Sequence, residues 1–103
     1  KSVNIEHADM CGWTPLMWAC YKGYSYVVSE LLDRGANPNV KADHNMTCLA
    51  WAAGRGHADI AKMLIDKGAK VNMTDKYGTT PLIWACRKGH AEIVDALIGE
   101  GAN

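Results

Sequence analysis

A pattern that recurs at a fixed interval constrains this chain more than any other feature. Trp18, Trp51 and Trp84 are evenly spaced along the sequence. Glycines keep the same phase after each tryptophan, first at Gly23, Gly56 and Gly89, then at Gly35, Gly68 and Gly101. A fixed period of about 33 residues is typical of short units that stack side by side and share a quasi-one-dimensional core. We therefore expect an all-α solenoid of three 33-residue helix-turn-helix repeats, joined by β-hairpin-like loops.

Each repeat carries signals for two helices. Thr14-Pro15 and Thr80-Pro81 predict the start of a first helix, because threonine is a good N-cap and proline suits the first helical position. Leu16 and Ala19, spaced i, i+3, mark the buried stripe of that helix, and their equivalents recur in the other repeats. Gly35 and its equivalents suit a left-handed cap after the second helix.

The phase of the pattern sets the expected boundaries. We predict repeats at residues 9–41, 42–74 and 75–103, the last of them cut at its C-terminal end, with residues 1–8 as the tail of a preceding repeat. On this interpretation the chain is a segment of a longer array. In the second repeat Ala42 replaces the aspartate of the hairpin and Asn45 replaces its glycine, so this hairpin is expected to be the weakest, although asparagine tolerates a positive φ.

Two features together resemble the ankyrin repeat over the whole chain. Thr-Pro-Leu opens a short helix, and Gly-Ala-x-x-Asn closes a second one. The amino-acid sequences of three segments, residues 12–23, 51–60 and 75–82, also resemble those of the ankyrin-repeat-rich membrane-spanning scaffolds, a family of neuronal substrates of protein kinase D. Met17, Ala50 and Ile83, which replace the usual ankyrin histidine, are part of that likeness.

The scaffold resemblance implies a function and a location. Members of that family carry a long cytosolic ankyrin array, followed by a P-loop NTPase-type region with membrane spans, and they link neurotrophin and other receptors to signalling partners. The resemblance thus implies a cytoplasmic binding segment of a signalling scaffold, held at the cytosolic face of a membrane by other parts of the protein. We expect no direct membrane contact from this segment, because it has no long apolar run.

Composition and cysteine spacing exclude several functions. The formal net charge is zero, which argues against a nucleic-acid binder driven by bulk phosphate attraction. The four cysteines form no Cys-x-x-Cys or Cys/His pair at ligand spacing, so we expect free thiols, no metal site and no cofactor. Cys20 and Cys86 are expected in the core, whereas Cys11, at a hairpin tip, is expected to be exposed and the most reactive. Because no nucleophile–base pair or phosphate loop occurs, we expect no enzyme.

The histidines have a structural interpretation. His57 and His90 follow a glycine at the start of the second helices, where we expect their side chains to satisfy free backbone groups of the helix end. Tyr24 stands at the equivalent place in the first repeat. A metal or catalytic role has no carboxylate or thiolate partner that recurs beside these positions.

Charge and aromatic residues divide the helices into two faces. Seven of the eleven acids fall on the second helices and predict a solvated outer face. The first helices lack acids, and each carries a tryptophan three or four residues before a cation, so ring and cation share one face. That face and the hairpin tips are expected to line a concave groove. The predicted partner-binding residues are Trp13, Trp18, Tyr21, Lys22, His44, Met46, Trp51, Arg55, Tyr77, Trp84, Arg87 and Lys88.

Three functional hypotheses follow. The first is a monomeric protein-interaction module that binds a protein or peptide with apolar and acidic residues, over a floor on which Trp18, Trp51 and Trp84 form a ladder. The second is binding of single-stranded nucleic acid by tryptophan stacking and arginine. Layers about 10 Å apart do not match stacked bases, which weighs against it. The third is an enzyme, for which the chain offers no catalytic pair. A structural alternative for the tryptophans is that the rings pack against each other between layers.

Overall fold

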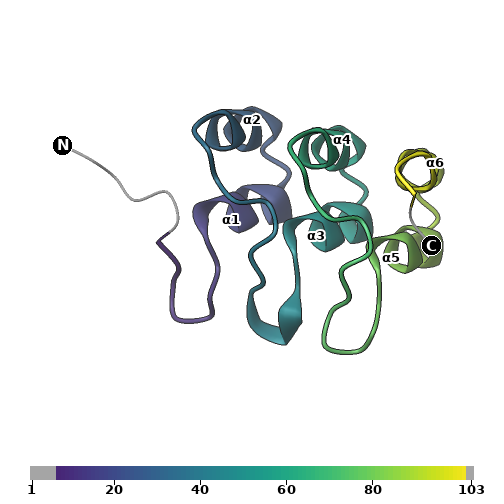
Figure 1. Ribbon diagram of the computed structural model, residues 1–103, viewed down its shortest axis with the longest axis horizontal. Coiled ribbons are helices and arrows are strands. Elements are labelled where there is room, and N and C mark those ends of the chain that lie inside the picture. Colours follow the sequence, from purple (N-terminus) through teal and green to yellow (C-terminus); the bar gives the residue numbers. More distant parts are fainter. Residues whose placement is uncertain (1–6, 102–103) are drawn as a thin grey trace.

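The computed structural model describes residues 7–101. Six α-helices form three stacked pairs, with one member of each pair in each of two layers (Figure 1). The predicted all-α solenoid is therefore confirmed, and the described residues contain no β-strand. The pairs are α1 (Pro15–Lys22) with α2 (Ser25–Asp33), α3 (Cys48–Arg55) with α4 (Ala58–Asp66), and α5 (Pro81–Lys88) with α6 (Ala91–Gly99).

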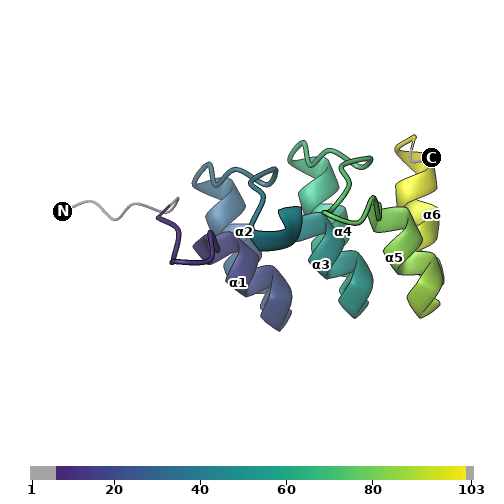
Figure 2. The same ribbon diagram turned by 90° about the horizontal axis from the view of Figure 1, so that it is seen from below.

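The two layers are clearest when the array is viewed from below. In that view α1, α3 and α5 lie side by side in front of the second helices (Figure 2). A single turn of 3₁₀-helix, η1 (Asp43–Asn45), lies in the loop between the first and second pairs. The expected repeat boundaries stay predictions. Most of the expected N-terminal tail and the last two residues of the third repeat lie outside the described residues.

Threonine caps begin all three first helices, as predicted. The Oγ1 atoms of Thr14, Thr47 and Thr80 each accept a hydrogen bond from the backbone N–H three residues later, at 3.4, 3.2 and 3.2 Å. At the other end of α1, Gly23 takes the left-handed conformation with φ of 80°, and Gly56 does the same after α3. The three first helices therefore start and stop through the same local chemistry.

The expected role of the histidines at the second helices is wrong. His57 and His90 occupy the N-cap positions of α4 and α6, but neither side chain makes a capping hydrogen bond. Each ring instead lies over a glycine of the preceding repeat. An ideal Cβ on Gly23 would be 2.7 Å from a ring carbon of His57, and one on Gly56 would be equally close to His90. The rings are therefore packing elements between repeats, which sequence position alone could not show.

The core follows the predicted stripe of the first helices and most of the apolar positions of the second helices, of which Val27 and Ile98 are exposed. Leu16 and Leu49 of the first helices are fully buried, as are Ile60, Leu64 and Leu97 of the second helices. Cys20 is buried as expected, but Cys86 is exposed, which corrects the prediction that both are core residues. The reason is positional: α3 covers the face of α1 that carries Cys20, whereas no described helix covers the same face of α5.

Backbone hydrogen bonds join the hairpin tips to one another. The N–H of Asp43 donates to the carbonyl of Cys11 at 3.1 Å, and the N–H of Lys76 donates to the carbonyl of His44 at 2.7 Å. The side chain of Asn39 adds a further link, because it donates to the carbonyl of Gly68 and accepts from the N–H of Lys70. Neighbouring repeats are thus tied together along the loops as well as through the core.

Candidate functional site

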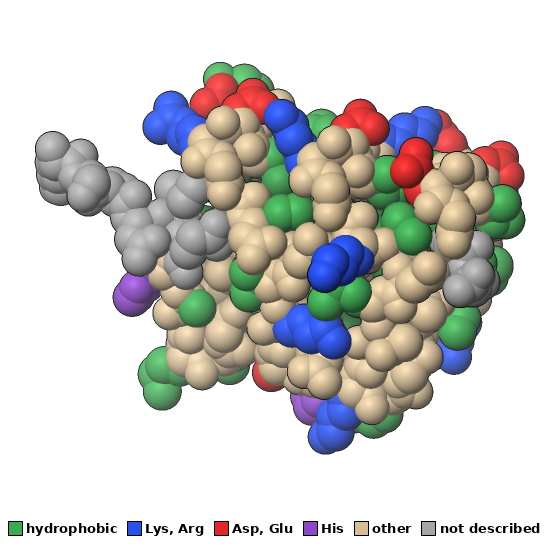
Figure 3. Space-filling model, in the orientation of Figure 1, with side chains coloured by type: hydrophobic (Ala, Val, Ile, Leu, Met, Phe, Trp, Pro, Cys, Tyr) green, Lys and Arg blue, Asp and Glu red, His purple; other side chains and the backbone are tan. Residues whose placement is uncertain are grey.

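The outer face of the array carries paired surface charges. Figure 3 shows acidic and basic side chains gathered along the edge over α2, α4 and α6, which agrees with the predicted solvated face. Lys62 and Glu92 lie 2.9 Å apart, and Lys67 and Asp33 lie 3.5 Å apart, all of them well exposed. Exposed ion pairs of this kind contribute only about 0–1 kcal/mol each. This face carries mixed charge, and a cavity of about 110 Å³ on it is lined by Ser29, Leu32, Asp33, Met63, Asp66 and Lys67.

The opposite side, formed by the first helices and hairpins, carries the tryptophans. Between the first and second repeats, Trp13, Trp18, Tyr21 and Trp51 form one aromatic cluster, called here the first junction. The ring of Tyr21 meets the ring of Trp51 edge-on, with centroids 5.0 Å apart. The guanidinium of Arg55 stands over the ring of Tyr21 at 4.4 Å, a cation–π distance. The first junction is therefore closed by its own side chains.

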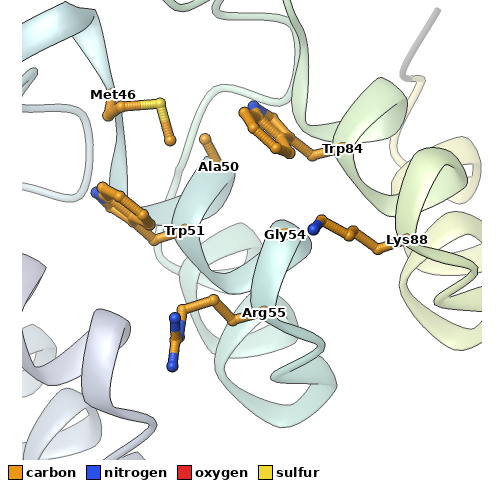
Figure 4. Close-up of a pocket in the computed structure, with 7 residues that line it drawn as sticks. All are labelled: Met46, Ala50, Trp51, Gly54, Arg55, Trp84 and Lys88. Atoms are coloured by element: carbon orange, nitrogen blue, oxygen red, sulfur yellow. The ribbon is translucent and has the colours of Figure 1, made fainter.

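Between the second and third repeats the same face is open. A cavity of about 170 Å³, called here the second-junction pocket, separates Trp51 from Trp84 (Figure 4). Ala50 and Gly54 of α3 lie between the two indoles, and the side chain of Lys88 points across from α5 towards Gly54 (Figure 4). The complete lining is Met46, Ala50, Trp51, Gly54, Arg55, Trp84 and Lys88.

A wider hollow adjoins this pocket on the hairpin side. It has a volume of about 420 Å³ and shares Met46, Trp51 and Trp84 with the second-junction pocket. The guanidinium of Arg87 lies 5.6 Å from the centre of the Trp84 ring at its border. The two cavities together form a continuous site over α3, α5 and the neighbouring hairpins. The hollow is lined by His44, Met46, Trp51, Asp75, Tyr77, Thr79, Trp84 and Arg87.

An aspartate of the hairpin orients the tryptophan in two of the three repeats. Asp75 accepts from the backbone N–H groups of Tyr77 and Thr79 through one oxygen, and from Trp84 Nε1 at 3.3 Å through the other. Asp9 holds Trp18 in the same way, at 3.2 Å. Burial alone would raise the pKa of Asp75, but these hydrogen bonds outweigh it and the net pKa lies below the ordinary value. Asp75 therefore stays ionised at neutral pH while orienting one wall of the site.

The second repeat lacks this aspartate. Ala42 stands in its place, and Trp51 Nε1 is buried without a hydrogen-bond partner. The turn itself is kept, because the N–H of Ala42 donates to the carbonyl of Met46 and the carbonyl of Ala42 accepts from the N–H of Asn45. Asn45 takes a positive φ of 58°, as its place in the hairpin predicts, and His44 takes the same value. The Trp51 indole is thus held by ring packing alone.

We expect Ala42→Asp to stabilise the protein. The new carboxylate can accept from Trp51 Nε1, and a buried donor without a partner costs about 1–3 kcal/mol, so the free energy of unfolding should rise by a similar amount. Urea unfolding measures the change. The gain should shrink when Ala42→Asp is made on a Trp51→Phe background, because phenylalanine has no N–H to donate. An equal gain in both backgrounds would show that the turn, and not the indole, accounts for the effect.

The increase in the free energy of unfolding caused by Ala42→Asp should depend on pH. Hydrogen bonds lower the pKa of Asp9 and of Asp75 below the usual 3.8. An aspartate held in this way stabilises the folded state at pH values above its unfolded pKa, and the stabilisation is lost as pH falls through the lower folded pKa. The advantage of Ala42→Asp over the parent chain should therefore disappear in acid.

The structure separates the predicted partner-binding residues into two groups. Eight of the twelve line the two cavities: His44, Met46, Trp51, Arg55, Tyr77, Trp84, Arg87 and Lys88. Trp13, Trp18 and Tyr21 belong to the first junction, and Lys22 is exposed beyond both cavities. The three tryptophans of the expected ladder are therefore not equivalent. Trp18 is 44% exposed beside a filled junction, whereas Trp51 and Trp84 face each other across a cavity.

Sequence reasoning missed three lining residues. Ala50 and Gly54 shape the second-junction pocket by being small, and Asp75 lines the wider hollow, beside Thr79 of the expected hairpin tip. Aligning the three repeats could have drawn attention to Gly54, because the equivalent position holds tyrosine in the first repeat and arginine in the third. The packing alternative for the tryptophans holds for Trp51, whose ring is 5.2 Å from that of Trp13.

The cysteines take no part in this site. Cys11 is exposed, and none of the four is in a disulfide. A hydrogen bond with Cys48, together with burial, raises the pKa of the Cys20 thiol, so it stays protonated. No group of three potential metal ligands occurs within residues 7–101. No helix of that part of the chain is both long and apolar enough to span a bilayer.

Comparison with known protein families identifies the repeat. The family model described as ankyrin repeats in three copies matches residues 38–103, and the single ankyrin repeat matches residues 11–43. The chain belongs to the ankyrin-repeat family. Ankyrin repeats are protein–protein interaction modules and generally lack catalytic activity.

Curated relatives share the ankyrin repeats over part of this chain. Calmodulin-binding transcription activator 5 of Arabidopsis thaliana is 40% identical over 42 residues, which are 41% of this chain and 5% of that protein. Calmodulin-binding transcription activator CBT of Oryza sativa subsp. japonica is 40% identical over 43 residues, 42% of this chain and 5% of that protein. Human Rabankyrin-5 is 38% identical over 43 residues, 42% of this chain and 4% of that protein. The chain thus spans only about 5% of the length of these relatives.

Proposed function

We propose that this ankyrin array binds a partner peptide or protein segment across the second-junction pocket and the wider hollow, and that the segment carries both apolar and acidic residues. The observation that carries the proposal is the cavity between the facing indoles of Trp51 and Trp84. Concave sites with aromatic walls and a few polar groups are typical of binding sites. Tryptophan is also among the residues most enriched at positions that dominate binding energy in interfaces.

Charge supports the acidic part of the partner. Arg55, Arg87 and Lys88 line the two cavities, and the one acid among the lining residues is Asp75. Asp75 is ionised and offsets one of these charges, so the three cations leave the lining with a surplus of positive charge. Complementary charge mainly raises the association rate and fixes orientation. An acidic segment therefore suits the site better than a neutral or basic one.

Single-stranded nucleic acid is the alternative ligand, because tryptophan and arginine side chains can also bind it. The first-junction rings pack against one another at tilted and edge-on angles, which leaves no flat series of ring faces on which successive bases could stack. The formal net charge of zero also gives little attraction to phosphates. The geometry thus favours a protein partner.

A selection experiment tests the proposal. The chain is immobilised, a library of random twelve-residue peptides is selected on it, and enriched peptides are measured by fluorescence anisotropy beside a labelled oligothymidylate of equal length. We expect acidic peptides with apolar residues that lose affinity with Arg87→Glu, and no oligonucleotide binding at physiological salt.

A matched variant on the outer face controls for the charge change. Asp95→Lys alters an exposed residue of α6 and should leave peptide affinity unchanged. Peptides that bind Arg87→Glu normally but not Asp95→Lys would place the partner on the outer face and contradict the proposal. Tight binding of the oligonucleotide would favour the alternative.

The resemblance to membrane-spanning scaffolds extends the proposal to the cellular setting. In that setting the array is cytoplasmic, is tethered to a membrane by other parts of a scaffold, and brings a neurotrophin-type receptor together with a signalling partner. The amino-acid sequences of residues 12–23, 51–60 and 75–82 support this extension. Immunoprecipitation of the full-length protein with such a receptor, compared with a form lacking these repeats, tests this extension.

A further inference from the structure

The two junctions of the array are built on the same frame. Positions one repeat apart occupy equivalent places, so each residue of the first junction, together with Met17 of α1 and Arg55 of α3, has a counterpart in the second. The two indole positions and the cation position keep their character, whereas the others become smaller. The counterparts are Trp13 and Met46, Met17 and Ala50, Trp18 and Trp51, Tyr21 and Gly54, Trp51 and Trp84, and Arg55 and Lys88.

In the first junction two rings fill the space between Trp18 and Trp51. The centroid of the Trp13 ring lies 4.6 Å from that of Trp18 and 5.2 Å from that of Trp51. The ring of Tyr21 meets Trp13, Trp18 and Trp51 edge-on, with centroids 5.5, 6.3 and 5.0 Å away. The guanidinium of Arg55 covers its face at 4.4 Å. Edge-to-face contact and a cation over the ring face are the arrangements that aromatic rings favour. Trp13, Trp18 and Tyr21 line neither of the two cavities of the second junction.

In the second junction Gly54 leaves the place of the Tyr21 ring empty. An ideal Cβ on Gly54 would lie 3.4 Å from a ring carbon of Trp84, so a side chain starting there would run along that indole. The resulting cavity of about 170 Å³ is comparable with a cavity of about 150 Å³ that accepts benzene. Lys88 points towards Gly54, at the place where Arg55 covers Tyr21 in the first junction (Figure 4).

We infer that the second-junction pocket accepts one aromatic side chain of the partner, which takes the place that Tyr21 fills in the first junction. The ring lies between Trp51 and Trp84, and the ammonium of Lys88 stands over its face. The inference rests on the proposed function and specifies the partner residue that anchors it. The chain itself supplies the template, because its own first junction shows how this frame holds a tyrosine ring.

The test uses p-cresol, which is the side chain of tyrosine, as the probe. Two-dimensional ¹H–¹⁵N spectra follow the indole N–H signals of the four tryptophans during a titration. We expect saturable shifts for Trp51 and Trp84 and none for Trp18. A non-aromatic probe of the same shape, 4-methylcyclohexanol, should bind at least fivefold more weakly.

Two variants at one position give the decisive comparison. Gly54→Tyr should fill the pocket from within and weaken p-cresol binding at least tenfold, whereas Gly54→Ala adds only a Cβ to the lining and should weaken binding by a much smaller factor, about two- to threefold. A third variant, Tyr21→Gly, should open the first junction and make the Trp18 signal respond. If Tyr21→Gly does not fold, the two Gly54 variants still decide.

Unchanged p-cresol binding in Gly54→Tyr, or the absence of a saturable shift at Trp84, would overturn the inference. Equal affinity for 4-methylcyclohexanol would also overturn it, because the pocket would then select apolar volume and not an aromatic ring. These failures are distinct from failure of the proposed function. Selected peptides that bind across the cavities without an aromatic residue would leave the proposed function standing and remove the inference alone.

Discussion

Replacing Trp84 by alanine is expected to weaken binding of a selected acidic peptide by about 2–4 kcal/mol, roughly a 30- to 1,000-fold rise in Kd. Trp84 forms a wall of both cavities, so its removal exposes the partner residue that it covers. Isothermal titration calorimetry measures the change. Circular dichroism establishes beforehand that the variant is folded.

Trp18→Ala is the matched control for this change. Trp18 donates to Asp9 as Trp84 donates to Asp75, so both variants lose the same hydrogen bond to a hairpin aspartate. Trp18 lines neither cavity, however, and its loss should leave Kd within about threefold, which is below about 1 kcal/mol. Equal losses of affinity in the two variants would mean that the partner contacts a uniform ladder of tryptophans and not the second junction.

The cations beside the indole should affect binding in another way. Arg87 and Lys88 are exposed, and exposed charge pairs are worth only about 0.2–1 kcal/mol. Changing both to alanine should therefore lower the association rate and flatten its dependence on ionic strength more than it changes the dissociation rate. Stopped-flow measurements at several salt concentrations separate these effects from the loss caused by Trp84→Ala.

A large effect on stability is expected at Gly56, as at the equivalent Gly23. Gly56 has φ of 81°, and a Cβ added to it would lie 2.7 Å from a ring carbon of His90. A left-handed conformation costs a residue other than glycine about 1–2 kcal/mol, and overpacking adds about 1–3 kcal/mol. Gly56→Ala should therefore lower the free energy of unfolding by about 2–5 kcal/mol, as measured by urea denaturation.

Gly89→Ala isolates the two contributions. Gly89 ends α5 as Gly56 ends α3, with φ of 76°, but a Cβ there would meet nothing within 4 Å. Its replacement should cost only the conformational part, about 1–2 kcal/mol. If the two alanine variants were equally destabilised, the His90 ring would have moved aside without cost, and its packing over Gly56 would not hold the second and third repeats together.

The fold could be predicted because its signals are local and repeated. The threonine at the start of each first helix and the glycine at its end act within a few residues, and the fixed period states which units are equivalent. The packing between repeats was harder to predict from the sequence. The rings of His57 and His90 lie over glycines of the preceding repeat, and nothing in their own segments distinguishes that role from capping.

The candidate site could be predicted as a face but not as a cavity. Ring and cation spacing placed Trp51, Trp84 and Lys88 on one side of the first helices, and the structure brings them together around one pocket. That the pocket lies at one junction depends on Gly54, which acts through the absence of a side chain. A cavity left by a glycine can be recognised only when the positions of the surrounding side chains are known.

The hydrogen bonds between hairpin tips determine how much ordering a partner must cause on binding. Asp43 and Lys76 each donate a backbone N–H to the preceding tip, so the loops beside the two cavities are already fixed to one another. Side-chain and loop ordering at an interface costs about 0.5–1.5 kcal/mol for each immobilised side chain, and loops held in place before contact avoid much of it. A flexible ligand therefore supplies most of the entropy loss, and rigidifying that ligand, for example by cyclisation, is the most direct way to raise its affinity.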